Sequence, residues 1–211
     1  MYIPKRYREE ERRKIVEFMQ EYGFATLVAW DGERPVASHL LMEVIDEEDA
    51  LLINGHMSRA NPLWKLLRPG QDVLVIFQGP HAYISPAWYN HVNVPTWNYQ
   101  SVHAYGRPRL LSDGAEYRAM LSRLIVRYEK ASSYRLENLP EDYVAKNMAG
   151  TVGFQIEVTR LEAGFKLSQN RDDEDYQNII LELEARGDDL SNGVAAAMRR
   201  GRRLDETPSS G

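Results

Sequence analysis

Three short runs of strand-forming residues follow one another near the start of the chain, and the connections between them are very short. We predict strands over Phe24–Trp30, Pro35–Ile45 and Ala50–Asn54. Asp31-Gly32 is typical of a hairpin turn, and the acidic turn Asp46–Asp49 separates the second strand from the third. A parallel pair of strands needs a crossover of about a dozen residues, so these strands are expected to form an antiparallel meander.

Further elements continue this pattern along the chain. We predict strands over Asp72–Ser85, Gln100–Leu111 and Thr151–Thr159, and helices over Arg8–Tyr22, Asp113–Lys130, Pro140–Met148, around Tyr176–Leu183 and over Leu190–Arg203. Asn61 and Pro62 begin a further short helix that ends before Pro69-Gly70. Glu116 occupies the capping-box position after Asp113. Six strands with helices placed between and after them predict a closed antiparallel barrel with helices outside, a mainly β fold with α additions.

The domain organisation follows from length and composition. A chain of 211 residues with 43% hydrophobic residues can bury one good core. We expect one barrel domain over residues 1–170, a helical extension over 171–204 and a disordered tail over 205–211.

Composition also excludes several classes of protein. The chain has no Cys, so disulfides, thiol nucleophiles and thiolate metal sites are excluded. The net charge of −5 argues against a protein built around contacts to a phosphate backbone. No apolar run approaches a membrane span, and no signal peptide is visible, so a cytoplasmic protein without membrane contact is expected.

The stretch Gln78–Gly106 is rich in aromatic residues and histidines, and its middle part, Pro86–Tyr99, is too long for a simple hairpin loop. Two interpretations remain open. The aromatic side chains pack in the core or in a dimer interface, or they form a wall for a flat aromatic ligand.

A second candidate region precedes the short helix that begins at Asn61. His56, Ser58 and Arg59 are expected between the end of a strand and the start of this helix, where free N–H groups and a guanidinium favour an anion. An ordinary helix cap is the competing interpretation. The five histidines have no metal-ligand spacing and are interpreted as hydrogen-bonded structural residues.

Four motifs are more specific: Pro35–Leu41 (PVASHLL), Asn54–Trp64 (NGHMSRANPLW), the Gln78–Tyr105 stretch with PTWNY, and Lys166–Arg171 (KLSQNR). With the order of elements, they resemble the PaiB family, described as FMN-binding negative transcriptional regulators. The resemblance implies the flavin-binding split barrel of pyridoxamine-phosphate-oxidase-like proteins. It also implies a homodimer that binds two FMN molecules at the subunit interface.

The resemblance implies roles for individual residues. His56, Ser58, Arg59 and Asn61 would hold the FMN phosphate, and Ser38, His39, Leu40 and Gln78 would lie along the isoalloxazine ring. Trp97, Asn98 and Tyr99 of the partner subunit would close over the flavin. The last implied group is Lys166, Ser168 and Gln169, which could instead cap the C-terminal helices.

Three functions compete at this point. The first is a flavin-dependent oxidoreductase or a flavoprotein that senses redox state. The second is a transcriptional repressor, although DNA as a partner has no support in the sequence beyond the basic cluster Arg199–Arg203, which we interpret as a solvated tail beside acids. The third is a haem-binding or haem-degrading protein, in which a histidine would be an axial ligand.

Overall fold

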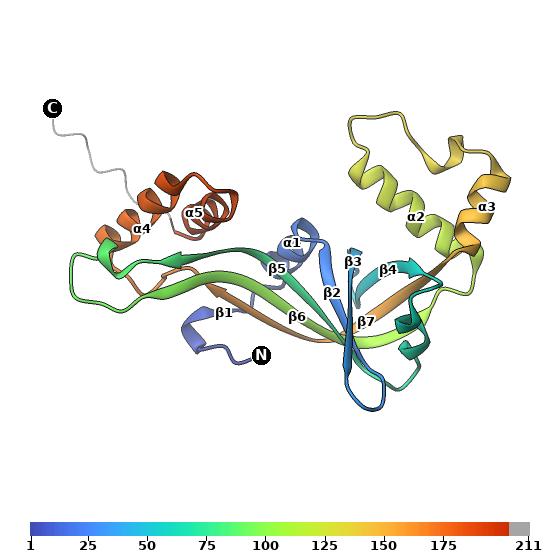
Figure 1. Cartoon of the computed structure of the whole chain (residues 1–211), viewed down its shortest axis with the longest axis horizontal. Coiled ribbons are helices and arrows are strands. Elements are labelled where there is room, and N and C mark those ends of the chain that lie inside the picture. Colours follow the sequence, from blue (N-terminus) through green and yellow to red (C-terminus); the bar gives the residue numbers. More distant parts are fainter. Residues whose placement is uncertain (203–211) are drawn as a thin grey trace. The chain divides into compact units, whose positions relative to one another are not determined.

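The computed structural model describes residues 1–202 (Figure 1). The strands are β1 (Arg8–Glu9), β2 (Phe24–Trp30), β3 (Pro35–Asp46), β4 (Leu51–Ser58), β5 (Val73–Ile84), β6 (Thr96–Leu110) and β7 (Thr151–Lys166). The α-helices are α1 (Arg12–Glu21), α2 (Gly114–Tyr128), α3 (Glu141–Ala149), α4 (Asp173–Arg186) and α5 (Asp189–Gly201). Short 3-10 helices are η1 (Lys5–Tyr7), η2 (Pro62–Leu66), η3 (Pro86–Trp88) and η4 (Leu136–Asn138).

The chain divides into two compact units. The barrel unit comprises Arg12–Phe77 and His103–Leu161. The helical unit comprises Met1–Glu11, Gln78–Val102 and the chain from Glu162 onward, with α4 and α5. The strands β5, β6 and β7 contribute residues to both units.

Six strands of the barrel unit form a closed ring. The order of hydrogen-bonded strands is β7-β4-β3-β2-β5-β6, and β6 also pairs with β7. The closing seam is tight, because a Cβ added at Gly106 on β6 would lie 2.3 Å from the carbonyl oxygen of Glu157 on β7. The predicted six-stranded antiparallel barrel is therefore confirmed, and β1 is an additional seventh strand in the sheet.

Side chains along each strand point alternately inward and outward, and the inward ones fill the interior of the barrel. Leu27, Ile53, Val75, Phe154 and Ile156 are all fully buried. They come from four different strands, and burying side chains of this size contributes about 1.5–3 kcal/mol each. The hairpin between β2 and β3 is held as its sequence predicts: the carboxylate of Asp31 accepts hydrogen bonds from the N–H groups of Glu33 and Arg34 at 2.8 and 2.9 Å.

Helix α2 packs on the barrel unit through an apolar stripe that the sequence predicted. Tyr117, Met120 and Leu124 are buried in one cluster with Leu111. The side chain of Asp113 caps the helix by accepting a hydrogen bond from Ala115 N at 2.8 Å.

A chain of polar side chains crosses four strands of the barrel unit, and we call it the polar ladder. Its members are Arg123 of α2, Glu43 of β3, Asn54 of β4, Gln155 of β7, Arg109 of β6 and Glu116 of α2. Each member bonds to the next: Arg123 Nε to Glu43 Oε1 at 2.6 Å, Asn54 Nδ2 to Glu43 Oε2 at 2.9 Å, Gln155 Nε2 to Asn54 Oδ1 at 3.0 Å, Arg109 Nε to Gln155 Oε1 at 3.0 Å and Arg109 Nη1 to Glu116 Oε2 at 3.0 Å. The ladder begins and ends on α2, so it fixes this helix against the strands. The expected capping-box role of Glu116 is wrong, because its carboxylate pairs with Arg109.

The helical unit has its own core between α4 and α5. Tyr176, Ile179, Val194 and Met198 are fully buried or nearly so, and Tyr176 donates a hydrogen bond to the carbonyl oxygen of Met198 at 2.8 Å. Burial raises the pKa of the Tyr176 phenol to about 12. In the same unit, Arg8 and Glu9 of β1 pair with Gly164 and Ala163 of β7.

The structure corrects the predicted ends of one helix and three strands. Arg8–Glu9 forms a strand, and α1 begins only at Arg12. Strand β4 continues to Ser58, because β7 supplies partners as far as Thr151. Strand β6 already begins at Thr96, and β7 runs on to Lys166.

The last part of the described chain is helical. Arg199 and Arg200 lie in α5 and not in a tail, and Arg199 pairs with Glu184. The predicted tail over 205–211 lies outside the described residues. Within residues 1–202, none of the helices combines the length and the apolar character that a membrane crossing requires.

Candidate functional site

Asn61 joins the segment after β4 to strand β3. Its Oδ1 accepts a hydrogen bond from Leu63 N at 3.0 Å, so it is the predicted N-cap, but the helix that follows is the five-residue 3-10 turn η2. Its Nδ2 donates to Ser38 Oγ at 2.9 Å. Ser38 is opposite Leu27 in the register of β2 and β3, so its side chain lies on the face that is buried in the barrel.

Strand alternation separates the three residues predicted on β3. Ser38 and Leu40 are opposite Leu27 and Ala25 and share their face. His39 points to the other face, where its Nδ1 lies 2.9 Å from Thr26 Oγ1. A ligand along this strand therefore meets backbone groups of all three residues but the side chains of only one face.

The guanidinium of Arg59 is bonded to main-chain carbonyl groups. Its Nε donates to Ala149 O at 3.0 Å, and Nη2 donates to Thr151 O at 3.2 Å. The carbonyl of Ala149 is at the C-terminus of α3, where a cation compensates the partial negative charge of the helix end. Arg59 also lies 5.9 Å from the ring centroid of Trp64, whose indole N–H donates to Arg59 O at 3.0 Å. Arg59 thus has a structural role whether or not it binds an anion.

His56 lies beneath α2, on strand β4. Its ring centroid is 6.5 Å from that of Tyr117, and its Nδ1 is buried and has no hydrogen-bond partner within residues 1–202. Burial lowers the pKa of His56, which favours the neutral imidazole. The ring of Tyr117 fits only because its neighbour is Gly153, where an added Cβ would lie 2.5 Å from the ring. The nearby Ser58 accepts a hydrogen bond from Ala60 N at 3.2 Å.

The structure joins two of the sequence motifs in the helical unit. Asn98 from PTWNY donates from Nδ2 to Ser168 Oγ of KLSQN at 2.9 Å, and the Ser168 hydroxyl lies 3.2 Å from Asn98 Oδ1. Asn98 is fully buried and Ser168 is 4% exposed. Gln169 closes its own turn by accepting a hydrogen bond from Leu167 N at 2.8 Å and donating to Phe165 O. These polar groups therefore form hydrogen bonds with one another and with the backbone.

Trp97 has a different environment. Its side chain is 46% exposed, its indole N–H donates to His81 Nδ1 at 3.2 Å, and Tyr83 contacts its ring edge-on at 6.2 Å between centroids. Gln78 is also exposed, whereas Tyr99 is half-buried. Lys166 donates a hydrogen bond to Thr96 Oγ1.

The predicted site residues thus fall into two groups. Ser38, His39, Leu40, His56, Ser58, Arg59 and Asn61 belong to the barrel unit, and Gln78, Trp97, Asn98, Tyr99, Lys166, Ser168 and Gln169 belong to the helical unit.

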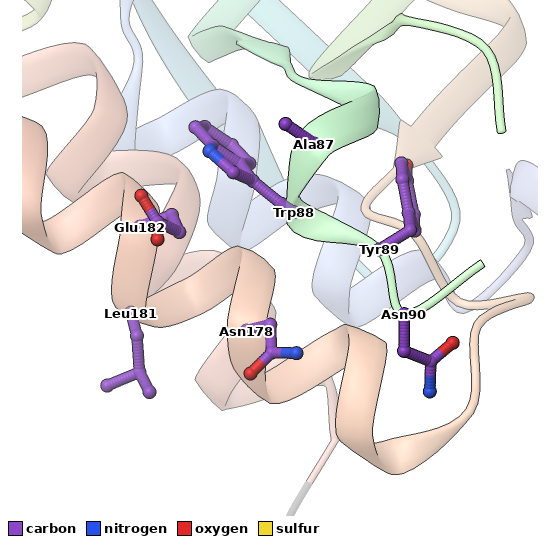
Figure 2. A pocket seen from close by; sticks show the side chains of 7 residues that line it. All are labelled: Ala87, Trp88, Tyr89, Asn90, Asn178, Leu181 and Glu182. Atoms are coloured by element: carbon purple, nitrogen blue, oxygen red, sulfur yellow. The ribbon is translucent and has the colours of Figure 1, made fainter. Parts of the chain in front are cut away.

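One cavity of about 310 Å³ lies where the loop after η3 meets α4 (Figure 2). Ala87 and Trp88 of η3, Tyr89 and Asn90 of the loop after it, and Asn178, Leu181 and Glu182 of α4 line the cavity. Figure 2 shows Trp88 extending toward the helix that carries Glu182, whereas Leu181 points away from the loop. Trp88 and Tyr89, from the aromatic stretch that was expected to pack or to form a wall for a ligand, line this cavity. None of the predicted site residues lines it.

Sequence reasoning missed two arrangements of charged residues. The members of the polar ladder are far apart in sequence, and nothing local connects them. The second is Arg171, whose guanidinium carbon lies 4.5 Å from the ring centroid of Tyr89. Arg171 is the last residue of the KLSQNR motif, so the motif could have indicated that Arg171 belongs with the other candidate residues. In the described part of the chain, no three His, Asp or Glu side chains are grouped so that they could hold a metal ion.

Residues 1–160 match the family model described as "Putative FMN-binding domain". "Protease synthase and sporulation protein PAI 2" of Bacillus subtilis is 40% identical to this chain over 186 residues, which cover 87% of this chain and 89% of that protein. The chain belongs to the PaiB family. A protein of Aspergillus fumigatus is 27% identical over 186 residues, 70% of this chain and 71% of that protein.

Solved structures confirm the fold at low sequence identity. The FAD and haem binding protein of Mycobacterium smegmatis superposes with a TM-score of 0.61 at 15% identity, over 81% of this chain and 79% of that chain. The flavocytochrome Anf3 of Azotobacter vinelandii superposes with a TM-score of 0.59 at 16% identity, over 83% of this chain and 78% of that chain. The PaiB-family chain therefore has the split-barrel fold of flavin-associated proteins.

Proposed function

We propose that this chain is a homodimeric FMN-binding protein of the PaiB type, whose bound flavin serves redox-linked or negative regulation. The observation that carries the proposal is the match of residues 1–160, which include the whole barrel unit except Leu161, to the FMN-binding family. The bond between Asn61 and Ser38 supports it, because it brings the segment proposed for the phosphate next to the strand proposed for the ring.

The phosphate contact is assigned to Arg59 together with Ser58 and Asn61. Two of the five N–H groups of the Arg59 guanidinium donate to carbonyl oxygens, and Nη1 has no such bond within residues 1–202. His56 contributes a neutral ring that does not carry the charge needed for an anion.

Exposed large apolar residues support the homodimer. Phe24 and Trp30 on β2 are 70% and 49% exposed, and in the helical unit Val94 and Trp97 are 70% and 46% exposed. Large exposed apolar side chains in groups mark interfaces. In the proposed dimer, each subunit places its Trp97, Asn98 and Tyr99 over the flavin that is bound to the other subunit.

The regulatory role is proposed to act through the flavin and not through a basic DNA-binding face. Arg199 of α5 pairs with Glu184, and Arg202, which follows α5, pairs with Asp173, so acids neutralise two of the arginines at this end of the described chain. A gel-shift assay at physiological salt is expected to show no binding of duplex DNA, and a salt-dependent shift would contradict this part of the proposal. A flavin-dependent oxidoreductase is the alternative, and reduction of bound flavin by NADH or NADPH would favour it.

The first experiment is an absorbance spectrum of the purified protein, which separates bound flavin from haem. The second compares FMN with riboflavin, which lacks the phosphate, in wild type and Arg59→Ala. Loss of a charge-assisted phosphate contact, about 1.5–3 kcal/mol, should weaken FMN roughly 10- to 100-fold and leave riboflavin affinity unchanged. Arg68→Ala is the matched control, because Arg68 is exposed and its Nε also donates to a carbonyl, that of Lys65, at 2.7 Å. Equal losses for FMN and riboflavin would show that Arg59 acts only through the fold.

A further inference from the structure

The turn that follows β7 brings two cationic residues to its two ends. Lys166 is the last residue of β7, and Arg171 closes the turn by donating a backbone hydrogen bond to Ser168 O at 3.0 Å. Ser168 adopts φ +61°, the left-handed region that side chains other than glycine rarely adopt. Its buried bond to Asn98 stabilises this conformation, so the positions of Lys166 and Arg171 are fixed by the core of the helical unit.

Each cation lies against an aromatic ring and not against a carboxylate. The ammonium of Lys166 donates to Thr96 Oγ1 and lies 5.8 Å from the ring centroid of Tyr7. The guanidinium of Arg171 lies over the ring of Tyr89 and beside its buried hydroxyl: burial raises the pKa of this phenol, and the contact with Arg171 lowers it. Burial and the positive charge of Arg171 both lower the pKa of Lys166, so holding the two cations together has a cost in the free protein.

The acids that follow Arg171 in the sequence are bonded elsewhere. Asp172 accepts from Asp175 N at 2.9 Å, Asp173 pairs with Arg202, Glu174 accepts from Asn90 Nδ2 at 2.9 Å, and Asp175 accepts from Asn90 N at 2.9 Å and lies 3.3 Å from His91 Nδ1. Within residues 1–202, no carboxylate forms an ion pair with Lys166 or with Arg171. Among the described residues, this pair of cations therefore has no carboxylate in direct contact; the buried Oδ2 of Asp175 has no hydrogen-bond partner there, and its charge acts on Tyr89.

We propose that Lys166 and Arg171 bind an oxyanion, the phosphate or carboxylate group of a small ligand. Two hydroxyl groups are placed to complete the site: Thr96, which accepts from Lys166 and can donate its own proton, and Tyr89, whose buried hydroxyl lies beside Arg171. A guanidinium and an ammonium together match the charge of a phosphate monoester, and bonds to ionised groups are the strong ones. This pair is separate from Arg59, whose guanidinium donates to backbone carbonyls, and it can be tested with inorganic phosphate whether or not flavin binds.

Inorganic phosphate tests the site directly in the full-length protein. Phosphate is titrated at constant ionic strength while the thermal unfolding midpoint is followed, because a ligand that binds the folded state raises this midpoint. We expect phosphate to raise the midpoint of wild type, and Lys166→Met and Arg171→Met each to weaken phosphate binding roughly tenfold or more. Lys166→Arg keeps the charge and should keep most of the effect.

Matched controls are Lys146→Met and Arg200→Met, since both residues are exposed on helices and form none of the contacts described for the site. Both controls should respond to phosphate as wild type does. The proposal is overturned if phosphate has no effect on wild type, or if the two site variants respond as strongly as the controls.

A second arm identifies the source of the oxyanion. If the preference for FMN over riboflavin falls in Lys166→Met and Arg171→Met, the occupant is the phosphate of the flavin itself. If that preference is unchanged while the response to inorganic phosphate is lost, the site belongs to a separate phosphorylated or carboxylated ligand. A wild type that responds to phosphate but binds no FMN would refute the proposed function and leave this site intact.

Discussion

Asn54 is the middle of the polar ladder, and its replacement tests whether the ladder stabilises the fold. The side chain is 2% exposed, donates to the carboxylate of Glu43 at 2.9 Å and accepts from Gln155 at 3.0 Å. Asn54→Leu keeps the same branching of the side-chain heavy atoms and removes both bonds. A bond to an ionised acceptor contributes about 1.5–3 kcal/mol and a neutral one about 0.5–1.5 kcal/mol. Burial of the leucine offsets about 1.5–3 kcal/mol of this loss, so we expect a net decrease of about 1–2 kcal/mol in the free energy of unfolding.

Urea unfolding followed by tryptophan fluorescence measures this change, with protein concentration held fixed because a dimer is expected. The midpoint should fall while the slope of free energy against urea stays constant. Asn192→Leu, at an exposed position of α5, is the control and should change stability by about 0.5 kcal/mol or less. A loss below about 0.5 kcal/mol for Asn54→Leu would refute the idea that the ladder stabilises the barrel.

A double-mutant cycle then tests whether the ladder acts as one network. Asn54 and Arg109 do not bond to each other, but both bond to the amide of Gln155, whose orientation is fixed only while both partners are present. Asn54→Leu and Arg109→Leu are therefore expected to be non-additive by about 0.5 kcal/mol or more. Additive effects would show that the ladder is a row of independent pairs.

Three further perturbations have defined outcomes. Gly106→Ala should destabilise the barrel by about 1–3 kcal/mol in urea unfolding, because the new methyl group meets the main chain of Glu157, which cannot move aside. The hydrogen bond from Arg109 lowers the pKa of Glu116 below its ordinary 4.5, so the stability it contributes is present above pH 4.5 and is lost as the pH falls through the lowered value. Glu116→Gln should thus be less stable than wild type at pH 7, and the difference should vanish in strong acid. Trp97→Ala should weaken FMN binding and reduce the effect of FMN on dimer dissociation in sedimentation experiments, whereas equal loss of dimer with and without FMN would contradict flavin stacking.

Gly114→Ala is the matched control for Gly106, because nothing lies within 4 Å of a Cβ added there. It should leave the stability of the barrel close to that of wild type. An equal loss in both variants would mean that glycine has no special role at the seam between β6 and β7.

Local signals in the sequence predicted most of the barrel. The Asp31-Gly32 turn, the cap at Asp113 and the apolar stripe of α2 all depend on residues close together in sequence, and the structure contains each of them. The ends of β4, β6 and β7 were wrong because the length of a strand is decided by its partner. Gly55, His56 and Ser58 give no strand signal of their own, but Phe154, Gly153 and Thr151 of β7 pair with them.

Contacts between distant segments explain why the candidate site was only partly predictable. Sequence motifs indicated that Asn98 and Ser168 matter, but not that they are bonded to each other across 70 positions of the chain. In the same way, the cationic character of Arg59 predicted an anion site, and only the fold shows that Ala149 and Thr151 occupy part of its guanidinium. The assignment of the site residues to FMN remains a proposal that the two binding experiments test.

The division of three strands between two compact units has a consequence for synthesis on the ribosome. The barrel unit ends at Leu161, so all its strands have been made before α4 and α5 exist. The helical unit needs residues 1–11, 78–102 and those from Glu162 onward, and cannot assemble until the last helix has emerged. During that interval the aromatic segment 78–102 lacks the α5 residue Met198, which Asn98 contacts at 3.7 Å in the finished fold. A nascent chain stalled shortly after β7 would therefore carry a completed barrel with an uncovered apolar segment, which is the form a chaperone would recognise.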